Sequence, residues 1–242
     1  SALEKTEGDF SRGLKEASKI LNIKGTVIPV SDAKMHLCIE LNNGGILKGE
    51  SHLDHSTEIR KNGVKRVFLR PNVKASSGSL KAIRRADLIV IGPGDHYGSI
   101  VPNLLCQGIS NEIRKSRAKV CYVCNLSNKK GQTDRYSLDD YAESINQYLK
   151  EDRIDFVLIP TERASEELVK KYERREGKGS VIDFGELEDE KRGYKIVKAS
   201  ILKNSKNFIP QGTFIRHDSD KLAKAVVEIL ELNGNRVIKE II

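Results

Sequence analysis

Short apolar segments alternate with amphipathic segments through most of the chain after residue 80. Apolar runs of strand length occur at 87–91, 119–124, 155–159 and 195–202. Between and after them, apolar residues recur at helical spacing near 100–116, 138–150, 164–175 and 219–232. This alternation predicts a parallel sheet with helices on both faces, and a ligand site at the carboxyl ends of its strands.

The first third of the chain has a different pattern. Apolar residues follow a helical stripe from Phe10 to Leu21. Strands are predicted at 23–30, 35–41, 46–50 and 64–69. The Asn42–Gly45 turn joins two of these strands, because Asn and Gly readily adopt the positive φ angles of a tight hairpin. Residues 24–75 are therefore predicted to form a β-rich subregion beside the main sheet.

Length and composition indicate an ordinary globular protein. The chain has 242 residues, of which 38% are hydrophobic and 31% are charged, and its formal net charge is +8. This length fits one large α/β domain or two small ones. Basic residues are mixed with acidic ones along the predicted helices, and no basic stripe contains interleaved aromatic residues. Nucleic acid is therefore a disfavoured partner.

The sequence contains no apolar run of the roughly 20 residues that a membrane span needs. Its first residues also lack the apolar core of a signal peptide, which predicts a cytoplasmic location. Cys121 and Cys124 have the spacing of a redox or metal pair. Both lie in a predicted strand, where residues three apart point to opposite faces, so buried structural thiols are the favoured interpretation.

The most informative motif follows the strand at 87–91. Gly92-Pro93-Gly94 ends the strand, and a helical pattern begins at Ile100. A strand, a glycine-rich turn and a helix start together direct free backbone N–H groups at an anion, usually a phosphate. The motif therefore predicts a nucleotide or sugar-phosphate site.

A second candidate segment follows the strand at 119–124. Asn125 comes directly after that strand, next to the glycine turn if the two strands are neighbours. A polar loop follows that can contact phosphate oxygens or sugar hydroxyls through Lys129, Lys130, Gly131 and Thr133. A long loop that ends in a helix cap is an equally good explanation for Thr133.

A third segment precedes the last predicted helix. Arg216 stands just before the helix cap at Asp218 or Ser219, where its fork of donors can meet an anionic ligand. His217 alone indicates little. No Walker loop, Gly-x-Ser-x-Gly elbow or His-Glu-x-x-His motif is present.

Together these three segments resemble one family. Residues 86–105 resemble its segment ADLIVIGPGSLYTSIxPNLL, residues 124–133 resemble CNLMTQPGET, and residues 215–223 resemble IRHDxxKLA. The family is that of the YvcK-like gluconeogenesis factors, which are homologous to the CofD-like 2-phospho-L-lactate transferases. The likeness extends over nearly the whole chain.

The resemblance implies a Rossmann-like, three-layer α/β/α fold with a mainly parallel sheet that binds a nucleotide or nucleotide sugar. The YvcK-like branch is associated with UDP-sugar binding, and with cell shape and wall synthesis during gluconeogenic growth. The CofD-like branch moves a 2-phospholactyl group from a guanosine diphosphate donor to a deazaflavin acceptor. The patterns around Asn125 and Arg216 favour the YvcK-like branch. There, Tyr172 and Arg216 match positions that look like nucleotide-sugar contacts, although a half-buried helix tyrosine explains Tyr172 equally well.

Two departures from the family pattern bear on function. The pattern begins with a glycine-rich strand, turn and helix, followed by Gly-Gly-Ser-Ser-Gly and Pro-Gly-Asp-x-Arg-Asn stretches, and none of these occurs here. Residues 1–242 are therefore expected to form a single CofD/YvcK-like domain that is truncated at its N-terminus. The usual Ser-Leu-Tyr-Thr is replaced by Asp95-His96-Tyr97-Gly98, and Asp95 repels phosphate unless it binds a metal or accepts hydrogen bonds from ribose.

The favoured hypothesis is a non-catalytic regulatory protein that binds a nucleotide sugar such as UDP-N-acetylglucosamine. Its predicted ligand residues are Gly92, Pro93, Gly94, Asp95, Tyr97, Ser99, Asn103, Asn125, Gly131, Thr133, Tyr172 and Arg216. No metal site is predicted, although Mg²⁺ can accompany a nucleotide diphosphate. The alternative hypotheses are a CofD-like transferase and a scaffold with an interface in residues 24–75. A homodimer is left open.

Overall fold

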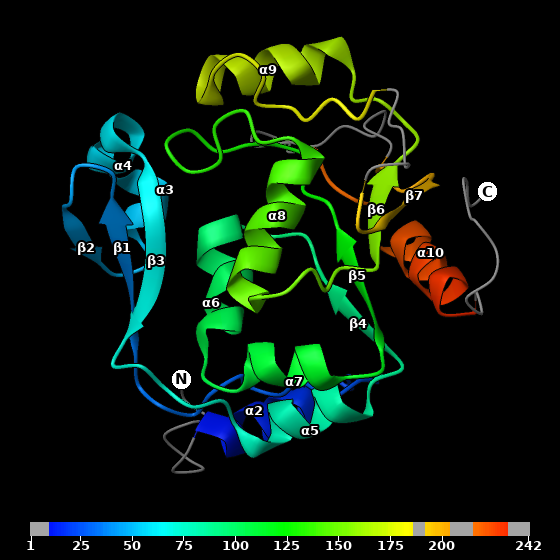
Figure 1. The fold of residues 1–242 in the computed structure, drawn as a ribbon. Helices are drawn as coiled ribbons and strands as arrows, with labels where there is room; N and C mark the ends of the chain where they lie inside the picture. Colours follow the sequence, from blue (N-terminus) through cyan, green and yellow to red (C-terminus); the bar gives the residue numbers. More distant parts are fainter. Residues whose placement is uncertain (1–9, 186–191, 204–214, 232–242) are drawn as a thin grey trace.

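The computed structural model describes residues 10–185, 192–203 and 215–231 and contains two sheets with helices between them (Figure 1). The larger sheet is parallel, and its strand order is β4-β5-β6-β7. Its strands are β4 (Leu88–Ile91), β5 (Lys119–Val123), β6 (Phe156–Pro160) and β7 (Lys195–Ala199). The four predicted strands of the α/β part are therefore confirmed. Parallel pairing places their carboxyl ends at one edge of the sheet.

Side chains of the parallel sheet alternate between two buried faces. Val120, Tyr122 and Val157 pack with α8 (Leu138–Leu149), whereas Cys121 and Leu158 pack with α10 (Ser219–Glu231). Helices on both faces of a mainly parallel sheet confirm the three-layer α/β/α class.

The cysteine interpretation is consistent with this alternation. Cys121 belongs to the α10 side of the core and Cys124 to the α8 side, and both are free, buried thiols. Burial raises the pKa of the Cys121 thiol to about 12, so it is protonated at neutral pH.

The smaller sheet is antiparallel, with the order β2-β1-β3. It consists of β1 (His36–Leu41), β2 (Ile46–Lys48) and β3 (Val64–Arg70). The predicted hairpin is present, with Gly44 at a φ of 86°. Two short helices, α3 (His52–His55) and α4 (Thr57–Asn62), connect β2 to β3. The segment 24–75 is thus β-rich, as predicted.

The strand predicted at 23–30 is wrong. This segment forms no strand, and Val27 is 50% exposed. The pattern of the segment resembles a strand, but Pro29 cannot donate to a sheet and the chain there pairs with neither sheet. The helix α2 (Phe10–Ile20) precedes it, as predicted.

The long helix predicted near 100–116 is divided. The chain first forms one turn of π-helix, η1 (His96–Ile100), which continues into α6 (Val101–Leu105). After a break it forms α7 (Ile109–Lys115). The helical path ends at Cys106, which is extended with a ψ of 127°, and Gly108, at a φ of 105°, leads into α7. The helix α5 (Ser77–Arg85) packs against α7.

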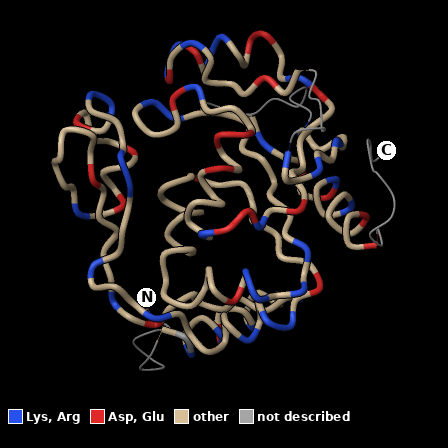
Figure 2. The backbone as a smooth tube through the Cα atoms, viewed as in Figure 1, with Lys and Arg blue, Asp and Glu red and all other residues tan. Residues whose placement is uncertain are grey.

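Charged residues are mixed over the molecule. Lys, Arg and Glu all occur along α9 (Glu166–Glu176), which lies above the carboxyl edge of the parallel sheet (Figures 1 and 2). Among the helices that the structure describes, none has the length and apolar character needed to span a bilayer.

Candidate functional site

A cavity of about 650 Å³ lies where β4 and β5 end. Its wall brings together seven of the predicted ligand residues from four distant parts of the sequence: Pro93, Gly94, Asp95, Asn125, Thr133, Tyr172 and Arg216. The carboxyl edge of a parallel sheet is the usual ligand position in α/β folds. We refer to this cavity as the glycine-turn cavity.

The glycine turn presents free backbone donors. Within the described part of the chain, the N–H groups of Gly94, Asp95 and His96 donate no hydrogen bond. Asp95 accepts from the Gly98 N–H through Oδ1 at 2.9 Å and so caps the π-helical turn that follows. Unpaired amides ahead of a helical turn form an anion-binding concavity.

Asn125 holds this turn in place. Its Nδ2 donates to the Gly94 carbonyl oxygen at 2.8 Å, and its Oδ1 accepts from the Tyr122 hydroxyl at 3.1 Å. Because β4 and β5 are neighbouring strands, Asn125 at the end of β5 lies beside the glycine turn at the end of β4. Because both ends of the amide already have partners, Asn125 acts by positioning the turn.

Lys129 lies between two carboxylates of the cavity wall. Its Nζ bonds to Asp54 Oδ1 at 2.6 Å and also to Asp95 Oδ2. Burial lowers the pKa of Lys129, but the bonds to both carboxylates outweigh burial and raise its pKa above the ordinary value. The ammonium therefore neutralises Asp95, which removes the expected repulsion between this carboxylate and a phosphate.

The floor of the cavity is a buried polar network. Thr133 is 2% exposed, and its hydroxyl accepts from the Lys129 N–H and the Tyr141 hydroxyl, each at 3.0 Å. The Tyr141 hydroxyl also lies 3.0 Å from Asn128 Oδ1. Thr133 therefore has a structural role in this network as well as a place in the wall.

His96 is a buried ionisable group of the wall, at 3% exposed. Its Nε2 pairs with Ser144 Oγ at 2.8 Å, while its Nδ1 has no hydrogen-bond partner among the described residues. Burial lowers its pKa to about 4, against a smaller raising effect of Asp95. The imidazole is therefore neutral at physiological pH.

The opposite wall comes from α9 and from the segment before α10. Tyr172 is 7% exposed, and its hydroxyl accepts from the Ile215 N–H at 3.0 Å. Burial raises the pKa of this phenol. Arg216 is exposed, and no described carboxylate pairs with its guanidinium.

The other predicted ligand residues lie elsewhere. Gly92, Ser99 and Asn103 line a separate cavity of about 550 Å³ beside the open edge of β4. Tyr97 is buried, and its hydroxyl lies 3.3 Å from that of Tyr136. Gly131 packs against α4 and accepts from the Val64 N–H at 2.9 Å.

The residues present do not fit a protein-held metal ion. In the described ranges, no three His, Cys, Asp or Glu side chains are grouped as metal ligands. Asp95, the acidic candidate from the sequence, is already paired with Lys129. A divalent cation at this site would therefore have to arrive with its ligand.

Sequence reasoning did not select Asp54 or His96 as ligand residues, and it named Lys129 only as a loop residue that can contact phosphate. The substitution of Asp95 for the family's serine was the available signal, because a carboxylate beside a phosphate site requires a counter-charge. Which cation supplies this counter-charge was not predictable, since Lys129 and Asp95 are 34 residues apart.

Fold and site together define an α/β protein with an anion-binding turn at the carboxyl edge of a parallel sheet. The family model described as "2-phospho-L-lactate transferase CofD" matches residues 1–202. The chain is 34% identical to a gluconeogenesis factor of Bacillus subtilis over 96% of its own length, and 37% identical to a putative one of Thermotoga maritima over 95%. The chain therefore belongs to the CofD family, among the gluconeogenesis factors.

A solved structure agrees with this assignment. The crystal structure of a Bacillus halodurans protein, described as a member of the upf0052 family, matches with a TM-score of 0.79 at 33% identity. The match covers 93% of this chain and 69% of that one. The chain spans 69%, 65% and 49% of three gluconeogenesis factors, from Bacillus subtilis, Halalkalibacterium halodurans and Clostridium acetobutylicum.

Proposed function

We propose that the glycine-turn cavity binds the diphosphate of a nucleotide sugar such as UDP-N-acetylglucosamine, and that the protein acts by binding, without turnover. The observation that carries this proposal is a set of backbone amides, at Gly94, Asp95 and His96, that donate no hydrogen bond within the described part of the chain. These residues line the same cavity as Arg216. Backbone donors and a guanidinium together satisfy a diphosphate with little need for a metal.

The other walls suit the rest of such a ligand. Tyr172 offers a ring edge for the base, and the polar floor around Thr133 and Asn128 offers partners for sugar hydroxyls. A cavity of about 650 Å³ lies within the range of small-molecule sites, roughly 300–1,000 Å³. A regulatory role in cell shape and wall synthesis during gluconeogenic growth belongs to the same proposal.

Calorimetry with UDP-N-acetylglucosamine tests the proposal. We expect saturable binding that Arg216→Ala weakens roughly tenfold or more, since a charge-assisted bond to a phosphate is lost. Arg174→Ala is the matched control, because Arg174 lies on α9 but does not line the cavity. No heat at millimolar ligand with a folded protein would exclude this function.

A second set of variants tests the neutralising role of Lys129. We expect Lys129→Met to weaken binding, because Asp95 then faces the phosphate uncompensated. Asp95→Asn in the same chain should restore part of the affinity, since an amide can still cap Gly98. Equal affinity of the single and double variants would show that Asp95 does not face the ligand.

The family description supplies the alternative, a transferase that moves a 2-phospholactyl group from a guanosine diphosphate donor to a deazaflavin acceptor. This reaction should require a divalent cation, which would compete with Lys129 for Asp95. Product formed from donor, deazaflavin acceptor and magnesium would favour the transferase. Failure with several donors would favour binding alone.

A further inference from the structure

A second cavity, of about 510 Å³, lies at the same edge of the parallel sheet, beyond the ends of β6 and β7. Among the described residues it shares Leu126 and Ile215 with the glycine-turn cavity and has its own remaining wall. None of the predicted ligand residues lines it. We call it the β6–β7 cavity.

Most of the wall of this cavity is apolar. Ile159 and Pro160 form its base at the end of β6, and Val169 contributes from α9. Val181, Ile182 and Phe184 close it from the segment after α9. An apolar wall with a few polar groups is the usual composition of a small-molecule site.

The two acidic side chains of the described wall, Glu162 and Asp183, already accept hydrogen bonds from other groups of the protein. Glu162 accepts from Ser200 Oγ at 2.7 Å and from the Ile201 N–H at 3.1 Å, and Lys221 Nζ lies 3.7 Å away. Burial alone would raise the pKa of Glu162, but these bonds outweigh burial and lower it. Asp183 Oδ1 accepts from the Gly185 N–H at 3.1 Å.

Two cations of the wall have no such partners. Neither Arg163 nor Lys198 forms a side-chain hydrogen bond or ion pair within the part of the chain that the structure describes. Lys198 is half-buried on β7, and Arg163 follows β6. We propose that the β6–β7 cavity binds a small organic anion with an apolar body, whose charged group is held by Arg163 and Lys198. The apolar body lies against Phe184 and its neighbours.

Two fluorescent probes measure separately how the anionic group and the apolar body of a ligand contribute to binding in the β6–β7 cavity. 8-Anilinonaphthalene-1-sulfonate carries an anionic sulfonate on an apolar ring system, and N-phenyl-1-naphthylamine is its uncharged counterpart. We expect the sulfonate to bind the intact chain saturably and roughly tenfold more tightly than the uncharged probe.

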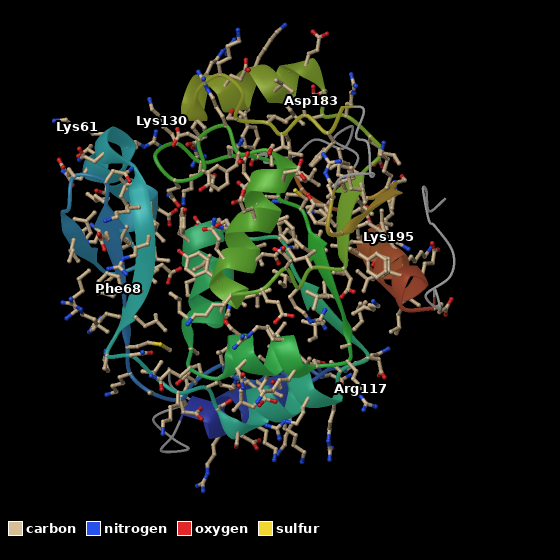
Figure 3. The ribbon with its side chains drawn as sticks, in the orientation of Figure 1. Lys61, Phe68, Arg117, Lys130, Asp183 and Lys195 are labelled. Carbon is tan, nitrogen blue, oxygen red and sulfur yellow. The ribbon has the colours of Figure 1, made fainter. Side chains whose placement is uncertain are left out.

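Substitutions in the wall locate the site. The double variant Arg163→Ala/Lys198→Ala should remove the advantage of the sulfonate and leave the uncharged probe nearly unaffected. Ala164→Trp should weaken both probes, because the indole fills the cavity. Lys195→Ala is the matched control, since Lys195 begins β7 and does not line the cavity. Figure 3 labels Lys195 together with Asp183, a residue of the cavity wall.

The outcomes also separate this site from the glycine-turn cavity. Arg216→Ala should leave sulfonate binding unchanged, whether or not it affects UDP-N-acetylglucosamine. An unchanged sulfonate advantage in the Arg163→Ala/Lys198→Ala variant, or its equal loss in Lys195→Ala, would overturn the proposal. So would sulfonate binding that Arg216→Ala removes. Far-UV circular dichroism of each variant confirms that the loss reflects the site and not the fold.

Discussion

His96 combines burial, an unpaired ring nitrogen and three aromatic neighbours. The rings of Tyr97 and Tyr141 meet it edge-on, with centroids 4.8 and 5.3 Å away. Its folded-state pKa of about 4 lies below the ordinary value of 6.5, so the unfolded chain takes up the proton first. The contribution of the neutral His96 imidazole to the free energy of unfolding is fully present above pH 6.5 and is lost as the pH falls toward 4.

The lowered pKa of His96 predicts a loss of stability in acid. From pH 6.5 to pH 4, His96 should reduce the free energy of unfolding by up to about 1.4 kcal/mol per pH unit. Urea denaturation of His96→Leu across this range should show a shallower slope than wild type. The exposed His55→Leu is the control, and a slope equal to wild type in His96→Leu would refute the assignment.

Gly131 combines a φ of 80° with a close approach to α4. A Cβ at this position would lie 2.3 Å from the Ile59 carbonyl oxygen and 2.8 Å from the Arg60 Cα. Neither backbone atom can move without displacing α4. Gly131→Ala should therefore cost about 3 kcal/mol or more in the free energy of unfolding, from strain and overlap together.

A substitution at Gly179 distinguishes the effect of backbone strain from the effect of overlap with α4. It has a similar φ of 77° with open space around its Cα, so Gly179→Ala carries the strain without the overlap. We expect a loss of about 1–2 kcal/mol there by chemical denaturation. Equal losses at both positions would mean that the contact with α4 contributes nothing.

Helix α8 begins with a reciprocal capping box. Ser137 Oγ accepts from the Asp140 N–H at 3.2 Å, and Asp140 Oδ2 accepts from the Ser137 N–H at 2.7 Å. Ser137→Ala should lower the free energy of unfolding by about 1 kcal/mol. Ser165→Ala at α9 is the comparison, with one cap bond at 3.4 Å and a helix that buries only Tyr172. A greater loss at α9 in urea titrations would contradict this ranking.

The sequence predicted a helix, strand or turn correctly where the local residue pattern alone determines that element. The Asn42–Gly45 hairpin depends on backbone freedom that residue type alone reveals, because Gly44 has a φ of 86°. The glycine turn after β4 was predicted from Gly92-Pro93-Gly94, which ends a strand. The break between α6 and α7 was missed, because the apolar spacing continues across it into α7. The pairing of Lys129 with Asp95 and Asp54 was also missed, since partners from distant elements depend on the packed fold.

At the scale of the whole molecule, one core joins the two sheets. Ile39 and Val67 of the antiparallel sheet belong to the same cluster as Val120 and Val157 of the parallel sheet. The loop after β5 reinforces this union, because Gln132 Nε2 donates to the Leu53 carbonyl oxygen at 2.6 Å. The glycine-turn cavity lies at this junction, so the geometry of its wall depends on both sheets.

A shared core predicts that the two sheets unfold together. The chain contains no Trp, so Phe68→Trp in β3 and Phe156→Trp in β6 give one fluorescent reporter for each sheet. We expect both variants to show one urea transition whose midpoint coincides with far-UV circular dichroism of the same variant, as all-or-none unfolding requires. The contrary result is a change in the fluorescence of the β3 reporter at a lower urea concentration than the change in far-UV circular dichroism of the same variant. Residues 24–75 would then form a separate cooperative unit, and the single-domain expectation would fail. In that case the Asp54–Lys129 pair would join two units that open independently, and the affinity for UDP-N-acetylglucosamine would fall in the urea range where only β3 has unfolded.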